Sequence, residues 1–371
     1  MLSLQFIREY PDSVRKAAEQ KNAPLDLDRL LALDGEVRAL KARIDELRRQ
    51  RNEISASFKT ADPAERPALG ARAKAFGAEA GEAETALAER SAELDALMLR
   101  LPGIPWEGAP VGPDESFNTV VRTEGEPPSF DFEPRDHVAL VEMNDWADLS
   151  RITQVAGSRM YALKGRLALL EQALMFWAQR IIAADGFTLM TVPALARPQA
   201  FVGTGHFPGH EEEAYEIPKD GLYLAGTGEI ALTSLHSGEI LEAAQLPILY
   251  AGYSPCFRRE AGSAGRDVRG LLRVHQFYKL EQYVICADDE EESARWHARL
   301  LANAETLLKA LEIPYQVVET STGDMGLGKY RMNDIEQLWV SRYLPSEGTQ
   351  LSMSFMRYLP SPMSPVEVST T

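Results

Sequence analysis

The chain has 371 residues, of which 45% are hydrophobic and 25% are charged, as in an ordinary globular protein. This composition excludes a disordered chain, a collagen-like fibre and a disulfide-stapled miniprotein, and the length predicts two or three domains. The net charge of −16 argues against nucleic-acid binding over the whole surface, so a polyanionic partner needs a local basic patch. Two cysteines are too few for a disulfide framework, and neither a secretory leader nor a membrane-spanning segment is expected, which predicts a cytoplasmic protein.

Residues 27–101 predict two long helices that form an antiparallel hairpin. Their apolar residues alternate spacings of three and four, which fits a heptad seam and not a strand. The first series includes Leu30, Leu33, Val37, Leu40, Ile44, Leu47, Ile54 and Phe58, and the second includes Leu69, Ala73, Phe76, Ala80, Ala83, Leu87, Leu94 and Leu97. At 1.5 Å per residue such a hairpin is about 45 Å long and too thin for a globular core, so it should project as an arm.

The arm carries a local excess of positive charge. Between residues 41 and 74, nine Lys or Arg residues accompany five Asp or Glu residues, a balance of +4. A solvated helical face with ion pairs accounts for this balance, and a phosphate-binding surface is the second interpretation. The cations predicted to contact phosphate are Arg48, Arg49, Arg51, Lys59, Arg66, Arg72 and Lys74.

Residues 102–135 contain seven prolines and four glycines, which predicts a linker between an N-terminal domain at 1–101 and a second domain at 136–371. In the second domain, helices are expected at 164–184 and 289–311. Strand-like runs lie at 188–193, 221–226, 246–260, 271–286 and 314–320. Because strands and helices do not alternate regularly, we predict an α+β fold with a mainly antiparallel sheet.

The segment 256–281 carries the strongest chemical signal. Two strand-like runs flank a glycine-rich loop bordered by charged residues, which are Arg258, Arg259, Glu260, Arg266, Arg269 and Arg273. Planar guanidinium groups bind phosphate oxygens in bidentate geometry, and Phe277 offers a flat face for a base. Any one arginine is better explained as a surface residue, but the whole set predicts a site for a nucleoside triphosphate.

This segment resembles motif 2 of class II aminoacyl-tRNA synthetases, in the form used by bacterial seryl-tRNA synthetases. The N-terminal hairpin resembles the tRNA-binding arm of that family. Three shorter motifs agree in order and spacing: Gly186, Phe187 and Pro193 resemble motif 1, the dimer element; Thr227-Gly228-Glu229 resembles the serine-binding loop; Thr322-Gly323-Asp324 also recurs in the family.

The resemblance implies a class II core with an antiparallel sheet flanked by helices. It also implies ATP-dependent activation of L-serine to seryl-adenylate, with Mg²⁺ bridging the phosphates. The seryl group would pass to tRNA(Ser), held by the arm, with tRNA(Sec) as a further candidate acceptor. A homodimer is expected, and no metal ligands are predicted within the chain.

The family's residue roles transfer to matching positions of this sequence. Arg258 would contact the α-phosphate and Glu260 the adenine amino group, as the catalytic pair. Serine would be bound by Thr227, Gly228, Glu229 and Glu281, the last accepting its hydroxyl. ATP would be bound by Arg258, Arg259, Glu260, Arg273, Val274, Phe277, Glu367, Val368, Ser369 and Thr370.

The C-terminal tail departs from the family pattern. The sequence RYLPS at 342–346 returns at 357–361, and residues 367–370 resemble the family's Glu-Val-Ser-Ser strand. Chance similarity in a Ser/Pro-rich tail is the alternative. Motif 3, which carries an ATP-binding arginine in the family, is not found. We therefore expect little or no aminoacylation by the chain alone. The alternative function is a truncated or catalytically impaired paralogue that binds tRNA or partners a synthetase.

Overall fold

The computed structural model describes residues 2–58, 60–261, 270–338, 352–353 and 357–358. The chain divides into two compact units, Met1–Ile104 and Pro105–Thr371.

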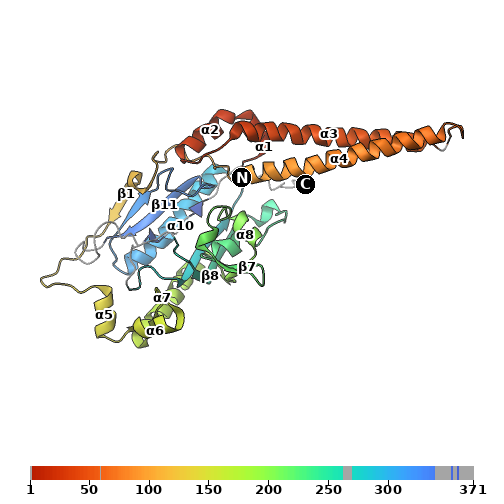
Figure 1. The fold of residues 1–371 in the computed structure, drawn as a ribbon. Helices are drawn as coiled ribbons and strands as arrows, with labels where there is room; N and C mark the ends of the chain where they lie inside the picture. Colours follow the sequence, from red (N-terminus) through yellow and green to blue (C-terminus); the bar gives the residue numbers. More distant parts are fainter. Residues whose placement is uncertain (1, 59, 262–269, 339–351, 354–356, 359–371) are drawn as a thin grey trace. The chain divides into compact units, whose positions relative to one another are not determined.

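The first unit is built from helices, two of which form the long hairpin predicted from the heptads. Helices α3 and α4 run side by side over their length (Figure 1). Asp26 caps the start of α3 by accepting a hydrogen bond from the backbone N–H of Arg29 at 2.9 Å. Proline occupies the first turn of α4, where a missing N–H costs nothing. The helices are α1 (Leu4–Glu9), α2 (Pro11–Gln20), α3 (Leu27–Ser57) and α4 (Arg66–Met98).

Burial along the hairpin is uneven. At its base, α1 and α2 supply extra apolar side chains, so Leu30, Leu33 and Leu94 lie in a shared core with Ile7 and Val14. Further along α3, the residues of the predicted seam that are buried are Ile44, Leu47 and Ile54. Most seam residues of α4 are half-buried, because two helices alone enclose little volume and many of these residues are alanine.

The second unit combines short and long helices with several small sheets. Its helices are α5 (His137–Met143), α6 (Ser150–Ala156), α7 (Gly165–Ala184), α8 (Pro198–Gly203), α9 (Glu229–Ser234) and α10 (Glu290–Ala310), with 3₁₀ turns η1 (Glu115–Phe117), η2 (Glu211–Glu213) and η3 (Ala243–Gln245). Its strands are β1 (Thr119–Glu124), β2 (Ala147–Asp148), β3 (Ala162–Leu163), β4 (Thr188–Thr191), β5 (Leu195–Ala196), β6 (Tyr215–Ile217), β7 (Leu222–Leu224), β8 (Ile248–Phe257), β9 (Gln276–Ile285), β10 (Tyr315–Glu319), β11 (Arg331–Gln337), β12 (Ser352–Met353) and β13 (Arg357–Tyr358).

The sheet β4-β8-β9 positions the chemistry predicted for motif 2. Strands β8 and β9 form a long antiparallel ladder from Ile248↔Ile285 to Phe257↔Gln276, while β4 joins β8 in parallel. Ala251 and Leu280 on one face pack against α7 through Ala178 and Ile182. Because side chains alternate along a strand, the neighbouring positions of β8 and β9 point to the opposite face.

The other large sheet has the order β1-β10-β11-β12, and β13 also pairs with β11. Every pairing in this sheet is antiparallel. Its core contains Tyr315, Val317 and Ile335, packed against Leu301 and Leu308 of α10. Smaller antiparallel pairings join β2 to β3 and β7 to both β5 and β6. Among the described strands only β4 and β8 are parallel, so the predicted α+β class with mainly antiparallel pairing is confirmed.

Part of the range predicted as a linker belongs to the second unit. Strand β1 pairs with β10, and the backbone N–H of Trp106 donates to the carbonyl of Tyr330 at 2.7 Å. Compact packing divides the chain between Ile104 and Pro105. The domain limits at 101 and 135 stay a prediction.

Candidate active site

The β8–β9 ladder sets three polar or aromatic side chains on the face of the sheet away from α7. Phe277, Lys279 and Glu281 occupy alternate positions of β9 and therefore share one face. Their cross-strand partners on β8 are the small residues Cys256, Ser254 and Gly252. Above Gly252 the space is filled by Leu232 of α9, which a Cβ at Gly252 would approach to 2.9 Å.

Glu281 is held through one of its two carboxylate oxygens. The hydroxyl of Thr227 donates to Oε1 at 2.6 Å, and Nζ of Lys279 lies 2.5 Å from the same oxygen. Oε2 is buried and has no hydrogen-bond partner within the described part of the chain. A buried acceptor without a donor is costly, so this oxygen is suited to a ligand hydroxyl.

Gly228 provides space beside that oxygen. A Cβ at this position would lie 3.1 Å from Oγ of Ser254 and 3.4 Å from Oε2 of Glu281. The next residue, Glu229, begins α9 and is only 8% exposed. Its backbone N–H donates to Oγ1 of Thr227 at 3.3 Å. The loop 227–229 thus contacts the Glu281 carboxylate through Thr227 and carries the buried Glu229, and we call the site formed by these residues the polar pocket.

Arg258 and Phe277 lie next to this pocket. Cζ of Arg258 is 5.2 Å from the ring centroid of Phe277, a cation–π arrangement, and Nε of Arg258 donates to the carbonyl of Gly226 at 3.3 Å. The backbone N–H of Phe257 donates to the carbonyl of Ala225 at 2.9 Å. The end of β8 is therefore joined to the chain just before Thr227, which places the predicted phosphate and serine residues side by side.

Glu260 and Arg273 pair across the loop that joins β8 to β9. Nη1 of Arg273 lies 2.7 Å from Oε2 of Glu260. Glu260 has φ = +54°, a left-handed conformation that is uncommon for a residue other than glycine and is often found at functional sites. Val274, the next residue along, is buried. The structure thus brings together the predicted residues at both ends of the hairpin.

Arg259 points elsewhere. Its Nη1 lies 3.1 Å from both the carbonyl and Oε2 of Glu212, and its backbone N–H donates to the carbonyl of Glu213 at 2.9 Å. It lines an open depression of about 350 Å³ with Tyr215 and Tyr223. These contacts separate the side chain of Arg259 from Arg258 and Phe277, and its role at ATP stays a prediction.

Burial shifts the titration of two further groups near the sheet. Burial raises the pKa of the Cys256 thiol, which disfavours the reactive thiolate at neutral pH. Burial likewise raises the pKa of the Tyr283 hydroxyl, keeping it neutral. Cys256 is therefore a core thiol rather than a nucleophile.

The arm residues predicted to bind phosphate differ in their surroundings. Arg48 pairs with Glu84 at 2.9 Å, and Arg49 pairs with Glu46 and Glu53. Cζ of Arg66 lies 5.9 Å from the ring centroid of Phe58. The exposed cations of this set that form no ion pair with any described residue are Arg51, Arg66, Arg72 and Lys74. Lys59, and Glu367 to Thr370 in the tail, lie outside the described residues.

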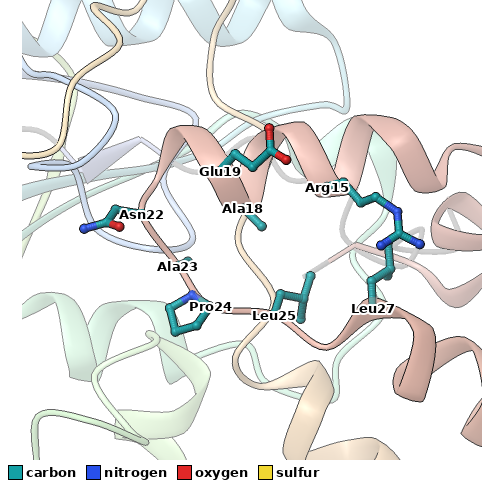
Figure 2. Close-up of a pocket in the computed structure, with 8 residues that line it drawn as sticks. All are labelled: Arg15, Ala18, Glu19, Asn22, Ala23, Pro24, Leu25 and Leu27. Atoms are coloured by element: carbon teal, nitrogen blue, oxygen red, sulfur yellow. The ribbon is translucent and has the colours of Figure 1, made fainter.

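A second open depression, of about 510 Å³, lies in the first unit between α2 and the start of α3. Figure 2 shows its lining, with Arg15, Ala18 and Glu19 from α2 and the rest from the connecting segment and Leu27. Arg15 at its edge pairs with Asp28 at 2.6 Å. None of the predicted serine or ATP residues lines this depression.

Two lysines at the site escaped the reasoning from sequence. Lys279 follows Phe277 by two residues on the same strand. Because side chains two residues apart on a strand share a face, the sequence could have predicted that Lys279 lies beside Phe277. Lys329 contacts Glu229 across a separation of 100 residues, and no local pattern signals such a contact.

Comparison with known proteins covers most of the chain. Residues 1–105 match the family model of the seryl-tRNA synthetase N-terminal domain, and residues 214–364 match the tRNA synthetase class II core domain (G, H, P, S and T). A serine–tRNA ligase from Deinococcus radiodurans is 50% identical over 347 residues, covering 94% of this chain and 80% of that protein. One from Methanocella arvoryzae is 40% identical, covering 92% of this chain and 81% of its own length.

Solved structures agree. The seryl-tRNA synthetase from Pyrococcus horikoshii complexed with ATP superposes with a TM-score of 0.83 at 34% identity, covering 91% of this chain and 80% of the other. The cytoplasmic serine–tRNA ligase from Naegleria fowleri in complex with AMP gives 0.81 at 25% identity, covering 94% of this chain and 81% of the other. With its helical hairpin, its β8–β9 ladder and these matches over nearly its whole length, the chain belongs to the seryl-tRNA synthetase family.

Proposed function

We propose that this protein is a serine–tRNA ligase, which activates L-serine with ATP and transfers the seryl group to tRNA(Ser). The observation that carries the proposal is the contact of the loop 227–229 with β9, where Oε2 of Glu281 is a buried acceptor without a partner among the described residues. An ammonium and a hydroxyl on one small molecule match these groups. Relatives at 40–50% identity are serine–tRNA ligases, which favours this function over a binding-only paralogue.

Selection of serine follows from the chemistry of the pocket. Glu229 pairs with the serine ammonium, and Oε2 of Glu281 accepts the serine hydroxyl. Alanine would leave that oxygen buried without a donor, and a site built for a hydrogen bond rejects an analogue that lacks the donor far better than it rejects a smaller apolar group. Thr227 and Lys279 fix Oε1, so Oε2 is oriented before the substrate arrives.

Activation requires two anions to approach each other. The serine carboxylate attacks the α-phosphate of ATP, forming seryl-adenylate and releasing pyrophosphate. Arg258, next to the serine pocket, offsets the charge that develops on the α-phosphate, and Phe277 stacks on the adenine. The serine-binding and ATP-binding residues also hold the two reactants in line, which lowers the activation barrier further. Arg273, now paired with Glu260, is placed to exchange that partner for the phosphate tail.

Mg²⁺ is implied by the sequence resemblance as a bridge between phosphates. Within the described residues, no three His, Cys, Asp or Glu side chains gather in a way that would hold a metal ion. Mg²⁺ usually binds through one or two carboxylates together with substrate phosphates, so at this site it would bind together with ATP.

The tRNA partner is assigned to the arm. Arg51, Arg72 and Lys74 are exposed on the hairpin and form no ion pair with a described residue, which suits contacts with the phosphate backbone. Ion pairs already occupy Arg48 and Arg49, so we assign these two a smaller share of the binding. We place the protein in the cytoplasm, where such a tRNA partner and the free thiols of Cys256 and Cys286 are expected.

A homodimer through α7 completes the proposal. By length and composition α7 is apolar enough to cross a membrane, and within the described residues it is the one helix that meets this test. One face packs on the sheet through Ala178 and Ile182. Its exposed apolar side chains are Leu169, Leu170, Leu174 and Phe176. These exposed side chains, on the helix that precedes the segment resembling motif 1, are suited to contact with a second copy of the chain.

The decisive experiment is ATP–pyrophosphate exchange with the full chain, with L-serine, L-alanine or no amino acid. In place of the weak activity that the missing motif 3 led us to expect from the sequence, we now expect exchange that depends on serine, with alanine near background, and loss of exchange in Arg258→Ala. A matched control is Arg295→Ala, which removes an exposed arginine of α10. Binding of tRNA without any serine-dependent exchange would instead establish the binding-only alternative.

A further inference from the structure

Lys279 lies on β9 midway between the residues assigned to the two ends of the reactants. Phe277, Lys279 and Glu281 share one face of the strand, with the adenine assigned to Phe277 and the serine hydroxyl to Glu281. At 3.4 Å per residue, Lys279 stands about 7 Å along the strand from each of them. The reaction joins the serine carboxylate to the α-phosphate, and this new bond lies between the hydroxyl and the adenine, so it forms near Lys279.

The ammonium of Lys279 lies at the polar pocket. Nζ is 2.5 Å from Oε1 of Glu281, and the two side chains are 19% and 15% exposed. Thr227 donates to the same oxygen at 2.6 Å, so both groups hold Oε1 and leave Oε2 to the serine hydroxyl. Because the hydroxyl and the carboxylate of serine are attached to neighbouring carbon atoms, a cation beside Oε1 is within reach of the carboxylate.

The same ammonium has N–H donors left over for a ligand. A lysine ammonium carries three N–H groups. Within the described part of the chain, the anion that contacts Nζ of Lys279 is the carboxylate of Glu281. Hydrogen bonds from a charged donor to a carboxylate are roughly twice as strong as those between neutral groups, so the remaining donors are suited to a second anion.

Arg258 and Lys279 form a pair of cations around the reacting atoms. Cζ of Arg258 lies 5.2 Å from the ring centroid of Phe277, on the side of the adenine, whereas Nζ of Lys279 lies on the side of the serine hydroxyl. The serine carboxylate and ATP are both anions and repel each other. One cation for each reactant offsets this repulsion, and it does so more strongly in a partly buried site than in water.

The other lysine of the site contacts the other carboxylate. Nζ of Lys329 lies 3.0 Å from Oε1 of Glu229, and these side chains are 5% and 11% exposed. Lys329 comes from the segment before β11 and not from the sheet that carries Phe277. Lys279 is therefore the lysine that the strand register places beside the reacting atoms.

Residues 110–114, at the start of the second unit, fix the loop that leads to Lys329. The N–H of Thr322 donates to the carbonyl of Pro110, and the N–H of Gly323 donates to the carbonyl of Gly112, both at 2.8 Å. These contacts do not involve β9, so a substitution in that strand leaves them in place.

We infer that Lys279 is a catalytic residue of the activation step: its ammonium binds one oxygen of the serine carboxylate and directs the other oxygen toward the α-phosphate. That second oxygen forms a bond to the α-phosphorus, the bond from the α-phosphorus to the bridging oxygen breaks, and its electron pair leaves with pyrophosphate. No proton is transferred, and Lys279 is unchanged at the end of the step. This inference rests on the proposed function, because it takes serine and ATP as the reactants.

The simpler role for Lys279 is to neutralise Glu281 alone. In that role, its loss would weaken every ligand whose hydroxyl is bound by Glu281, whether or not the ligand has a carboxylate. Contact with the substrate carboxylate instead predicts an extra loss for ligands that carry one. Ethanolamine separates the two roles, because it keeps the hydroxyl and the ammonium of serine and lacks the carboxylate.

The test measures binding of L-serine, ethanolamine and ATP, separately, to the full chain and its variants by NMR titration. We expect Lys279→Met to weaken L-serine at least about tenfold more than it weakens ethanolamine, and to change ATP by less than about twofold. Lys279→Arg, which keeps the charge, should recover part of the difference. Lys309→Met is the matched control, because it removes an exposed lysine that pairs with Glu124 at 3.4 Å in the same unit.

The rate of ATP–pyrophosphate exchange provides the second readout. For Lys279→Met we expect kcat to fall by about a hundredfold, since a nucleophile displaced by about 1 Å reacts more slowly by about that factor. Equal losses for L-serine and ethanolamine would overturn the inference, as would a kcat within about twofold of wild type. A loss for ATP as large as the loss for L-serine would show general damage to the site and would also overturn it.

A second pair of variants keeps the test open if Lys279→Met unfolds. The double variant Glu281→Gln with Lys279→Met leaves no buried charge alone, and it is compared with Glu281→Gln. L-serine should bind the double variant about tenfold more weakly, with ethanolamine the same for both. Equal L-serine affinities would show that Lys279 acts only through Glu281, which overturns the inference. A wild-type chain that binds neither serine nor ATP would instead show that the proposed function is wrong.

Discussion

The hydroxyl of Thr227 donates a hydrogen bond to Oε1 of Glu281 over 2.6 Å, although 54 residues separate them. The same hydroxyl oxygen accepts a hydrogen bond from the backbone N–H of Glu229 at 3.3 Å. One side chain therefore couples the carboxylate of Glu281, which we assign to the serine hydroxyl, to the backbone of Glu229, whose side chain we assign to the serine ammonium.

Replacing this hydroxyl should weaken serine selectively. Thr227→Val keeps the shape but removes the donor to a charged acceptor, and such hydrogen bonds contribute about 1.5–3 kcal/mol. We expect the KM for serine in pyrophosphate exchange to rise at least about tenfold, with the KM for ATP little changed. Thr306→Val, which removes an exposed hydroxyl on α10, serves as control. A proportional rise in both KM values would argue against the selective role.

Phe277 should contribute to ATP affinity through its ring. Stacking of a base on an aromatic side chain is worth about 1–3 kcal/mol, so Phe277→Leu should weaken ATP by about tenfold or more. Serine binding should remain near the wild-type value. Phe132→Leu alters a ring that is 62% exposed and provides the comparison. An unchanged dissociation constant for ATP would remove the basis for placing adenine here.

The arm should bind tRNA through its unpaired cations. The triple variant with alanine at Arg51, Arg72 and Lys74 should bind tRNA more weakly than wild type. The slope of log K against log salt concentration should become shallower by about 0.7–0.9 for each phosphate that is no longer neutralised. Arg49→Ala should have a smaller effect, because Glu46 and Glu53 already offset that charge. The measurement is a filter-binding titration at several salt concentrations. An equal or larger effect of Arg49→Ala would contradict the assignment.

The exposed face of α7 should determine the oligomeric state. Phe176 is 63% exposed in the isolated chain, and a carboxylate there would be buried in a dimer through this face. We expect Phe176→Glu to halve the mass measured by light scattering, whereas Phe132→Glu should leave the mass unchanged. A dimer that survives Phe176→Glu would place the interface elsewhere.

His297 should make the protein sensitive to mild acid. Burial, with a smaller effect from the positive Arg331, lowers the pKa of His297 to about 4. An ordinary histidine, as in the unfolded chain, titrates near 6.5, so between these values the unfolded state binds more protons and stability falls as the pH decreases. At pH 5 the loss relative to pH 8 is roughly 2 kcal/mol, since each pH unit below 6.5 contributes about 1.4 kcal/mol.

Unfolding midpoints measured from pH 8 to pH 5 test this expectation. The variant His297→Gln should lose less stability than wild type over that range, because it has no proton to take up on unfolding. His210→Gln, at an exposed loop position, should follow the wild-type curve. Parallel curves for His297→Gln and wild type would rule out His297 as the source of the acid sensitivity.

Features with local causes could be predicted from the sequence. The heptads at 30–58 and 69–101 predict the helices observed at 27–57 and 66–98, because helical periodicity is visible within a few turns. The helix predicted at 164–184 begins one residue later, at Gly165. The strands β8 and β9 also lie within their predicted runs. Residue roles at Thr227, Glu281 and Phe277 came from the family resemblance, and the structure adds their contacts.

Features with distant causes could not be predicted. The ion pair of Lys329 with Glu229 depends on how residues 110–114 hold a loop some two hundred residues later. The prolines and glycines at 102–135 indicate that this segment lacks regular secondary structure. The sequence does not reveal that the backbone of this segment is nevertheless fixed by hydrogen bonds outside helices and sheets. Arg259 follows the same rule, because its partner Glu212 lies on a separate loop.

The attachment of residues 106–114 to the later loop restricts where the arm can be trimmed. The backbone N–H of Trp106 donates to the carbonyl of Tyr330, and Cζ of Arg331 lies 4.1 Å from the ring centroid of Trp106. A shortened protein that starts at Pro105 keeps every one of these supports beneath the amino-acid pocket. A protein that starts ten residues later lacks these contacts. Engineered versions without the arm should therefore keep serine recognition if they begin before residues 106–114 and lose it if they begin after them.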